Sequence, residues 1–146
     1  MIERRHTVRA TTRTETGRAA IEASGAECWI GTPDRLATLR GALDSVTIVC
    51  WLLGSAAGPP EELGALHRTR LELFLTQAID TTVRGFIYEA CGTITPPEDL
   101  REGERTVRAI TGRSMIPAAF LTVDPNDAAA WQSQAASAVE SLLTPA

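Results

Sequence analysis

The sequence contains no lysine, and all 14 of its basic residues are arginines. An arginine side chain stays protonated in proteins, whereas a lysine amine can become neutral and then act as a nucleophile or a base. Enzyme mechanisms that depend on a lysine are therefore excluded. Tyrosine is almost as scarce, because Tyr88 is the only one in the chain.

Cysteine and histidine are also rare, and their spacing suggests neither a disulfide framework nor a metal site. Cys28, Cys50 and Cys91 are isolated and each lies in an apolar run, which predicts buried, reduced thiols. His6 and His67 have no partner at metal-ligand or triad spacing, so we expect both on the surface. Cys91 has one alternative role, a nucleophilic or redox thiol at a strand end, but we favour a core cysteine because no base accompanies it.

Long apolar runs are absent. The longest, residues 46–58, is too short and too interrupted by glycine to cross a bilayer, which needs about 20 apolar residues. The first residues contain no apolar signal core. The net charge of −4 gives no reason to expect nucleic acid as a partner. The sequence thus predicts a cytoplasmic protein with no membrane or nucleic-acid partner.

The arginines are unevenly distributed, and a local basic cluster lies near the start of the chain. Its members are Arg4, Arg5, Arg9, Arg13 and Arg18. Runs of charge usually keep a surface solvated, so we favour a solvated face over an anion-binding site.

What the sequence does contain is an alternation of β-prone and helix-prone segments. With 146 residues and 44% hydrophobic composition, residues 1–146 fit one globular domain. The predicted strands are residues 7–12, 27–30, 46–53, 85–90 and 118–123. The predicted helices are residues 15–24, 32–43, 61–80, 98–111 and a last one after residues 124–127. This alternation indicates an α/β fold, a three-layer, doubly wound parallel sheet of the Rossmann-like type. The continuous apolar run at 46–53 predicts its central strand.

Five segments follow one another in a characteristic order. They are HTVRATTR, GAECWIG with LATLRGAL, DSVTIVCWLLGSA, the helix ending in LELFLTQAID, and the strand in VRGFIYEACGT. This order, from residue 7 to about residue 121, resembles strands two to five of the NAD(P)-binding Rossmann domain of extended short-chain dehydrogenases/reductases, the NAD-dependent epimerase/dehydratase family. The resemblance implies a Rossmann fold and NAD or NADP as a partner.

The family's first strand and its glycine-rich turn, which grips the pyrophosphate, have no counterpart in the sequence. None of the eleven glycines follows a predicted strand with G-x-G-x-x-G or G-x-x-G-x-x-G spacing. In the family's strand order, 3-2-1-4-5-6, the missing strand would separate residues 7–12 from residues 46–53. Those two strands could pair directly, or a neighbouring chain could supply a strand. The third hypothesis, which we favour, is that the true protein is longer and Met1 is not its start.

The family's catalytic pair, a tyrosine and a lysine four residues later, is incomplete as well. Tyr88 lies inside a predicted strand, and the residue four positions later is Gly92. The serine that the family places at the end of its fifth strand corresponds to Ala90 or Cys91. The family's acid–base chemistry is therefore not supported, no catalytic residue is assigned, and whether the protein is an enzyme is left open.

On the cofactor side, the resemblance implies contacts after the second and third strands. Arg13 stands where a guanidinium would bind the 2′-phosphate of NADP, and Thr12 stands where an acidic residue would favour NAD. An ordinary surface arginine is the alternative. Thr32 and Asp34 stand near the adenine position, but a helix cap with a first-turn carboxylate also explains them, and we favour that interpretation.

Gly54 and Ser55 close the fourth strand, where the cofactor would pass or a plain turn would form. The candidate cofactor-binding residues are thus Thr12, Arg13, Thr32, Gly54 and Ser55. We expect an NAD(P)-binding Rossmann-type protein of the epimerase/dehydrogenase lineage, truncated at its N-terminus and without Tyr–Lys catalysis. Binding of NADP or NAD would be weak or absent in this chain as it stands. The alternative is a cofactor-free structural module that forms homo-oligomers through open strand edges.

Overall fold

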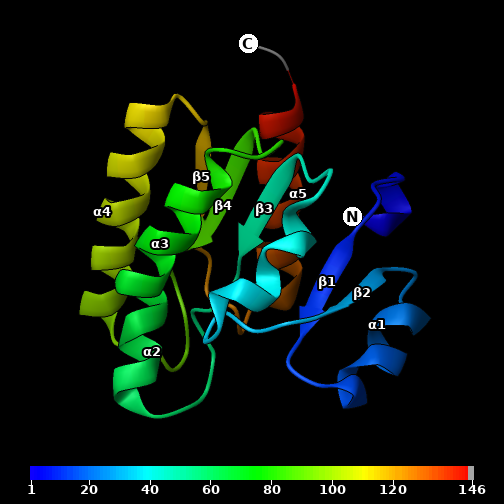
Figure 1. Cartoon of the computed structure of the whole chain (residues 1–146), viewed down its shortest axis with the longest axis horizontal. Coiled ribbons are helices and arrows are strands. Elements are labelled where there is room, and N and C mark those ends of the chain that lie inside the picture. Colours follow the sequence, from blue (N-terminus) through cyan, green and yellow to red (C-terminus); the bar gives the residue numbers. More distant parts are fainter. Residues whose placement is uncertain (145–146) are drawn as a thin grey trace. The chain divides into compact units, whose positions relative to one another are not determined.

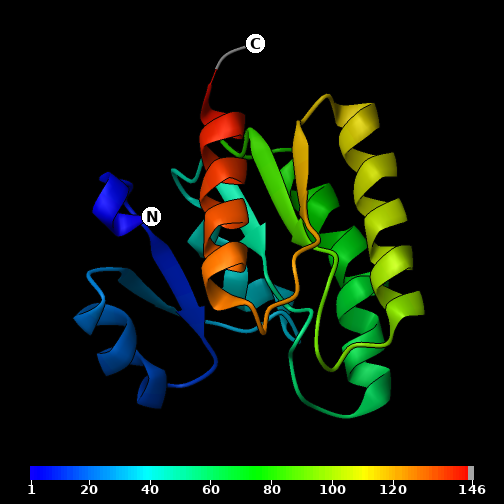
Figure 2. The same ribbon diagram turned by 180° about the vertical axis from the view of Figure 1, so that it is seen from behind.

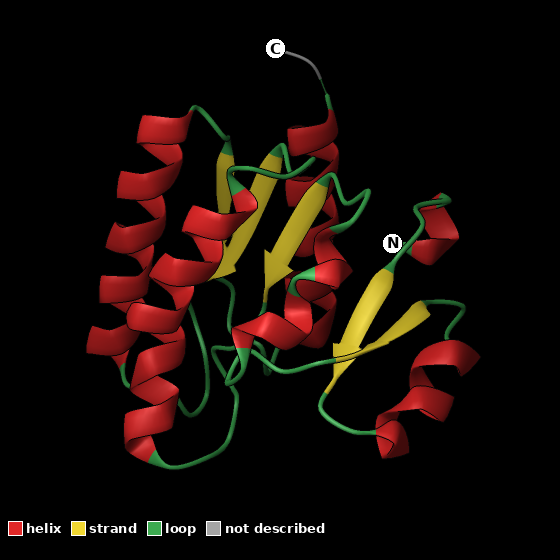
Figure 3. Ribbon diagram, viewed as in Figure 1, coloured by secondary structure: helices red, strands yellow, loops and turns green. Residues whose placement is uncertain are grey.

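The computed structural model describes residues 1–144, and its five strands form two parallel sheets (Figure 1). One sheet has two strands and the other has three. The chain divides accordingly into two compact units, Met1–Asp44 and Ser45–Ala146. Every strand pair is parallel, and helices alternate with strands along the chain, as the sequence pattern predicts (Figure 3). That residues 1–146 form one domain stays a prediction.

The first unit consists of one parallel strand pair and short helical segments. Its elements are a 3₁₀ turn at Ile2–Arg4, β1 at Arg9–Thr12, a 3₁₀ turn at Glu15–Gly17, α1 at Arg18–Ala23, β2 at Glu27–Ile30, and 3₁₀ turns at Leu36–Leu39 and Gly41–Leu43. Gly25 follows α1 with a φ of 89°, a left-handed conformation that glycine adopts without strain and that ends the helix as predicted.

The predicted helix over residues 32–43 is wrong, because two 3₁₀ turns replace it. The Thr38 hydroxyl accepts a hydrogen bond from Thr32 N (2.9 Å) and donates one to Arg35 O (2.6 Å). Such side-chain bonds compete with the backbone ladder of an α-helix. Gly41 also lies tightly against the Trp29 ring, where an added Cβ would be 2.8 Å from a ring carbon.

The second unit is an α/β/α sandwich. Its elements are β3 at Ile48–Trp51, α2 at Pro60–His67, α3 at Thr69–Ala78, β4 at Gly85–Glu89, α4 at Pro97–Ser114, β5 at Ala118–Leu121 and α5 at Ala128–Leu143. The strand order is β3-β4-β5. Helices α2, α3 and α4 cover one face of this sheet and α5 covers the other (Figures 1 and 2).

β4 is the central strand of this sheet and β3 is an edge strand, so the prediction that residues 46–53 form the central strand is wrong for this sheet. All five residues of β4 are buried, whereas β3 has an edge without a strand partner among residues 1–144. β1 pairs with β2 in the first unit and β3 pairs with β4 in the second, and the direct pairing of β1 with β3 stays a hypothesis. Cys50 on β3 is exposed because α5 packs mainly on β4 and β5. The prediction of buried thiols is wrong for Cys50, and Cys28 and Cys91 are half-buried.

The predicted continuous helix over residues 61–80 is interrupted at Arg68, where φ is −124° and ψ is −101°. The Trp51 indole N–H donates a hydrogen bond to Leu66 O at 3.1 Å, so a tertiary contact occupies a carbonyl of the last turn of α2. The Trp51 ring also packs on Phe74 of α3, with ring centroids 4.9 Å apart. A contact between distant residues thus sets the end of α2 and the start of α3.

No helix within residues 1–144 combines the length and the apolar character that crossing a membrane requires.

Candidate functional site

Three of the five predicted cofactor residues lie together where β1 and β2 end. Gly31 N donates a hydrogen bond to Thr12 O at 2.9 Å, which joins the carboxyl ends of the two strands. Arg13 follows β1, and its Nη1 lies 2.9 Å from Asp34 Oδ2 in the turn after β2. We call Thr12, Arg13, Thr32 and Asp34 the strand-end cluster. The Arg13 side chain is 58% exposed, so its guanidinium remains accessible despite the ion pair.

Thr32 does not cap an α-helix as the favoured interpretation expected. Its hydroxyl oxygen accepts a hydrogen bond from Asp34 N at 3.2 Å, which forms a short turn and holds the Asp34 carboxylate beside Arg13. The Thr12 hydroxyl donates to Thr14 O at 3.4 Å, and it lies so close to Gly17 that a Cβ there would overlap with it. The side chains around Arg13 are therefore fixed by local turns.

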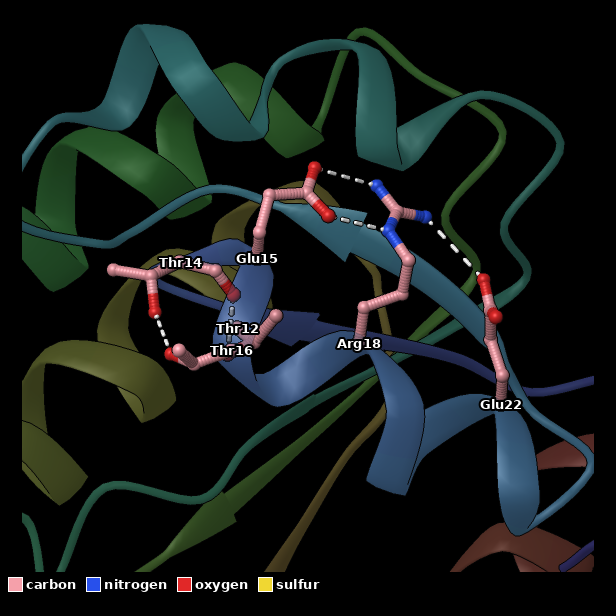
Figure 4. Close-up of polar contacts among 6 residues, drawn as sticks. All are labelled: Thr12, Thr14, Glu15, Thr16, Arg18 and Glu22. Carbon is pink, nitrogen blue, oxygen red and sulfur yellow. Dashed lines mark hydrogen bonds and ion pairs between the residues drawn. The ribbon is translucent and has the colours of Figure 1, made fainter.

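The loop after β1 leads into α1 through further polar contacts (Figure 4). The Arg18 guanidinium binds Glu15 (2.7 Å) and Glu22 (3.3 Å), and these contacts raise the pKa of Arg18. Arg9 in β1 is paired with Glu27 in β2 at 3.1 Å. Arg9, Arg13 and Arg18 of the basic cluster thus each contact a carboxylate, and Arg13 is the most exposed of the three.

The other two predicted residues, Gly54 and Ser55, belong to the second unit. Gly54 O accepts a hydrogen bond from Thr95 N at 3.3 Å, and Ser55 Oγ accepts one from Thr93 N at 3.0 Å. A Cβ at Gly54 would overlap with Cys91 O. Gly54 is thus a glycine because two loops pack closely, and its backbone faces protein.

Glu89 at the end of β4 holds these loops together and was not identified from the sequence. It is only 5% exposed, and it accepts hydrogen bonds from Gly54 N on Oε1 (2.8 Å) and from Trp131 Nε1 on Oε2 (3.1 Å). Burial raises the pKa of Glu89, and the two hydrogen bonds act in the opposite direction. The sequence feature that could have identified Glu89 is a carboxylate at the end of an otherwise apolar predicted strand, GFIYE.

Tyr88 is fully buried in β4 and is held by His67. Its hydroxyl lies 2.7 Å from His67 Nδ1 and 3.4 Å from Leu100 O, and burial raises its pKa. The prediction of a surface histidine at position 67 is wrong, since His67 is fully buried and burial lowers its pKa. Its Nε2 lies 3.4 Å from Thr95 Oγ1. The tyrosine hydroxyl thus packs in the core rather than facing a ligand.

No group of three or more His, Cys, Asp or Glu side chains within residues 1–144 is placed to hold a metal ion. In the strand-end cluster the exposed Arg13 guanidinium lies beside the Asp34 carboxylate, and the loops of the second unit present mainly satisfied backbone and side-chain groups.

Neither a protein-family model nor a curated protein matches the chain. Solved structures do. The triphenylmethane reductase of Citrobacter sp., complexed with NADP(H), matches with a TM-score of 0.58 at 19% identity, over 77% of this chain and 38% of that one. The structure of gox2253 matches with a TM-score of 0.62 at 21% identity, over 82% of this chain and 44% of that one. The likeness shows a Rossmann-like α/β fold, as the sequence predicts, and the chain spans less than half the length of these proteins.

Proposed function

We propose that the strand-end cluster is the 2′-phosphate end of an NADP(H)-type dinucleotide site, in a Rossmann-type protein that lacks Tyr–Lys catalysis. The observation that carries this proposal is the exposed Arg13 guanidinium beyond the carboxyl end of β1. Ligands of parallel α/β folds bind outside the carboxyl ends of the strands. The NADP(H) bound to the similar triphenylmethane reductase supports the same class of ligand.

The chemistry of the cluster favours a phosphate over a hydroxyl. A guanidinium has five N–H donors, and the Asp34 contact at 2.9 Å leaves others for a second anion. A phosphate can accept two parallel hydrogen bonds from Arg13, which a ribose 2′-hydroxyl cannot. A threonine at position 12, in place of an acidic residue, adds no negative charge at the end of β1.

The proposed role is binding, without the family's proton transfer. The chain has no lysine, and the hydroxyl of Tyr88 is buried against His67. A catalytic acid must come within hydrogen-bond distance of the substrate proton, so a buried tyrosine does not supply one.

The binding experiment is an NMR titration of the ¹⁵N-labelled chain with 2′,5′-ADP and with 5′-ADP. We expect 2′,5′-ADP to shift the amide signals of residues 12–16 and 32–34 and to bind more tightly than 5′-ADP. Arg13→Ala should weaken binding of 2′,5′-ADP by about 10- to 100-fold, because hydrogen bonds to charged groups contribute about 1.5–3 kcal/mol. Arg40→Ala, which removes another exposed arginine of the first unit, is the matched control. Equal affinities of wild type and Arg13→Ala for 2′,5′-ADP would refute the proposal.

We further propose that the sheets take up one more parallel strand, carried by a longer form of this protein together with a glycine-rich turn. β1 and β3 each have one edge without a strand partner among residues 1–144, which is what supports this proposal. The genomic DNA upstream of Met1, read in frame, should encode a β-prone run followed by that turn. An extended chain should then gain thermal stability with NADPH, and the present chain should gain little. An upstream frame closed by a stop codon would contradict the proposal.

A further inference from the structure

The Asp34 carboxylate is held beside Arg13 by its own turn. Asp34 N donates to Thr32 Oγ1, and the Thr32 hydroxyl donates to Asp34 Oδ2, both at 3.2 Å. Thr32 is itself anchored, because Thr32 N donates to Thr38 Oγ1 at 2.9 Å and Arg35 N donates to Thr32 O at 3.0 Å. The Asp34 side chain is 24% exposed, against 58% for Arg13. The carboxylate is therefore the fixed member of this ion pair, and the long arginine side chain adapts to it.

Asp34 and the proposed 2′-phosphate contact the same guanidinium. The donors of a guanidinium form one compact planar fork, and Arg13 Nη1 lies 2.9 Å from Asp34 Oδ2. A phosphate on the remaining donors therefore lies close to the carboxylate, within the Debye length of about 10 Å at 0.1 M salt. A phosphate monoester carries about −1.5 to −2 charges at pH 7, so the two anions repel each other. A ribose 2′-hydroxyl is uncharged and avoids this repulsion.

A second ion pair of the same sheet provides an internal comparison. Arg9 Nη2 lies 3.1 Å from Glu27 Oε2, and these two residues pair at the first position of β1 and β2. Thr12 pairs with Ile30 at the last position, three residues and about 10 Å further along the strands. Glu27 thus resembles Asp34 in its charge and in its arginine partner, but it lies at the opposite end of the strands.

We propose that Asp34 is a specificity-determining residue of the dinucleotide site, a fixed negative charge that opposes the binding of a 2′-phosphate to Arg13. This inference rests on the proposed NADP(H) site. Arg13 favours a 2′-phosphate over a 2′-hydroxyl, and Asp34 reduces that preference. The ratio of the two affinities therefore depends on the ion pair and not on the arginine alone.

The experiment compares dissociation constants of 2′,5′-ADP and 5′-ADP for the wild type and Asp34→Asn, measured by NMR titration at about 0.1 M salt. An amide keeps an oxygen that accepts hydrogen bonds, so this variant removes the charge and retains the turn. We expect it to bind 2′,5′-ADP about three- to tenfold more tightly than the wild type. Its affinity for 5′-ADP, which lacks the 2′-phosphate, should stay within about twofold. Equal or weaker binding of 2′,5′-ADP would overturn the inference.

Glu27→Gln is the matched control, because it changes the net charge by the same amount at the other end of the strands. It should leave both affinities within about twofold of the wild type. If it tightened 2′,5′-ADP binding as much as Asp34→Asn does, net charge would be the cause and the inference would fail. Asp34→Ser, which also removes the charge and suits a turn, decides the outcome if Asp34→Asn does not fold.

Salt separates the charge of Asp34 from a change in the turn. At about 1 M salt the Debye length falls to about 3 Å, so the gain from Asp34→Asn should shrink to less than about twofold. A gain that salt leaves unaltered would come from a changed structure and would contradict the inference.

Arg13→Ala distinguishes this inference from the proposed function. If Arg13→Ala weakens 2′,5′-ADP binding and Asp34→Asn does not tighten it, the inference alone fails. If Arg13→Ala binds 2′,5′-ADP as the wild type does, the proposed function fails, and the inference that rests on it fails as well.

Discussion

Tyr88 and His67 illustrate how burial changes what a residue can do. From the sequence, the single tyrosine lies inside a predicted strand with no lysine to complete a Tyr–Lys pair, and the histidine is expected on the surface. In the structure their side chains bind each other at 2.7 Å, and both are fully buried. A buried polar group requires a hydrogen-bond partner, so the two side chains stabilise the core together.

We predict that Tyr88→Phe destabilises the protein by about 1–3 kcal/mol, because it leaves His67 Nδ1 buried without its partner. Urea denaturation gives this free energy of unfolding directly. Thr16→Ala, which removes an exposed hydroxyl, is the control and should change stability by less than about 0.5 kcal/mol. A Tyr88→Phe variant as stable as the wild type would contradict the structural role of the pair.

Glu89 predicts a specific dependence of stability on pH. Its folded-state pKa is raised above the ordinary value of 4.5, so the folded protein binds the proton more tightly than the unfolded chain does. The stability that this carboxyl group contributes is therefore greatest below its unfolded pKa and is lost as the pH rises through the folded pKa. Urea denaturation between about pH 4 and pH 7 measures it.

The matched comparison is Glu89→Gln against the wild type. We expect the wild-type advantage in the free energy of unfolding to shrink as the pH rises through this range. Glu102→Gln, which removes an exposed carboxylate of α4, controls for the change in net charge. A wild-type advantage that grows with pH would show that the hydrogen bonds from Gly54 and Trp131 outweigh burial.

At the scale of elements, the two loops after β3 and β4 depend on glycine at their contact. A Cβ at Gly92 would overlap with Gly54 O, a backbone atom that cannot move aside as a side chain can. We predict that Gly92→Ala lowers the free energy of unfolding by about 1–3 kcal/mol. Differential scanning calorimetry should record a lower Tm for this variant.

Gly112 provides the opposite case within the second unit. It lies in α4 with no atom within 4 Å of an added Cβ, so Gly112→Ala should raise stability by about 0.5–1 kcal/mol through its helix propensity. If the two alanine variants lost equal stability, the close loop contact would not be the cause at Gly92.

The elements that the sequence predicted well are those determined by local patterns. Short β-prone runs became β1, β2 and β4 near the expected residues, and glycines flank β2 and β4, since periodicity and turn residues act within one segment. The break at Arg68 could not be predicted, because it depends on a hydrogen bond from Trp51 to Leu66 O. The place of β3 at an edge likewise depends on which strands pair with it.

The candidate site was predicted in the same uneven way. The positions of Thr12, Arg13 and Thr32 at strand ends follow from the order of strands, which the sequence contains. The ion pair joins Arg13 to Asp34, which is 21 positions later in the chain, and the hydrogen bond from Gly54 N to Glu89 spans 35 positions. No local sequence pattern encodes contacts over such separations.

For the whole molecule, the fold is Rossmann-like, and we propose that Arg13 binds the 2′-phosphate of a dinucleotide in a protein without Tyr–Lys catalysis. The similar solved structures support the fold, and Arg13 supports the choice of NADP(H) over NAD(H). In this proposal, dinucleotide binding does not depend on catalysis, because the residues that would bind the adenosine end differ from those that would transfer a proton.

The most direct test is the ratio of the dissociation constants for NADH and NADPH, measured by nucleotide fluorescence for the wild type and for Arg13→Ala. We predict that the wild type binds NADPH about tenfold or more tightly than NADH, as a charge-assisted hydrogen bond of about 1.5 kcal/mol or more implies. In Arg13→Ala the ratio should fall to about one. An unchanged ratio in the variant, or tighter binding of NADH by the wild type, would contradict the account.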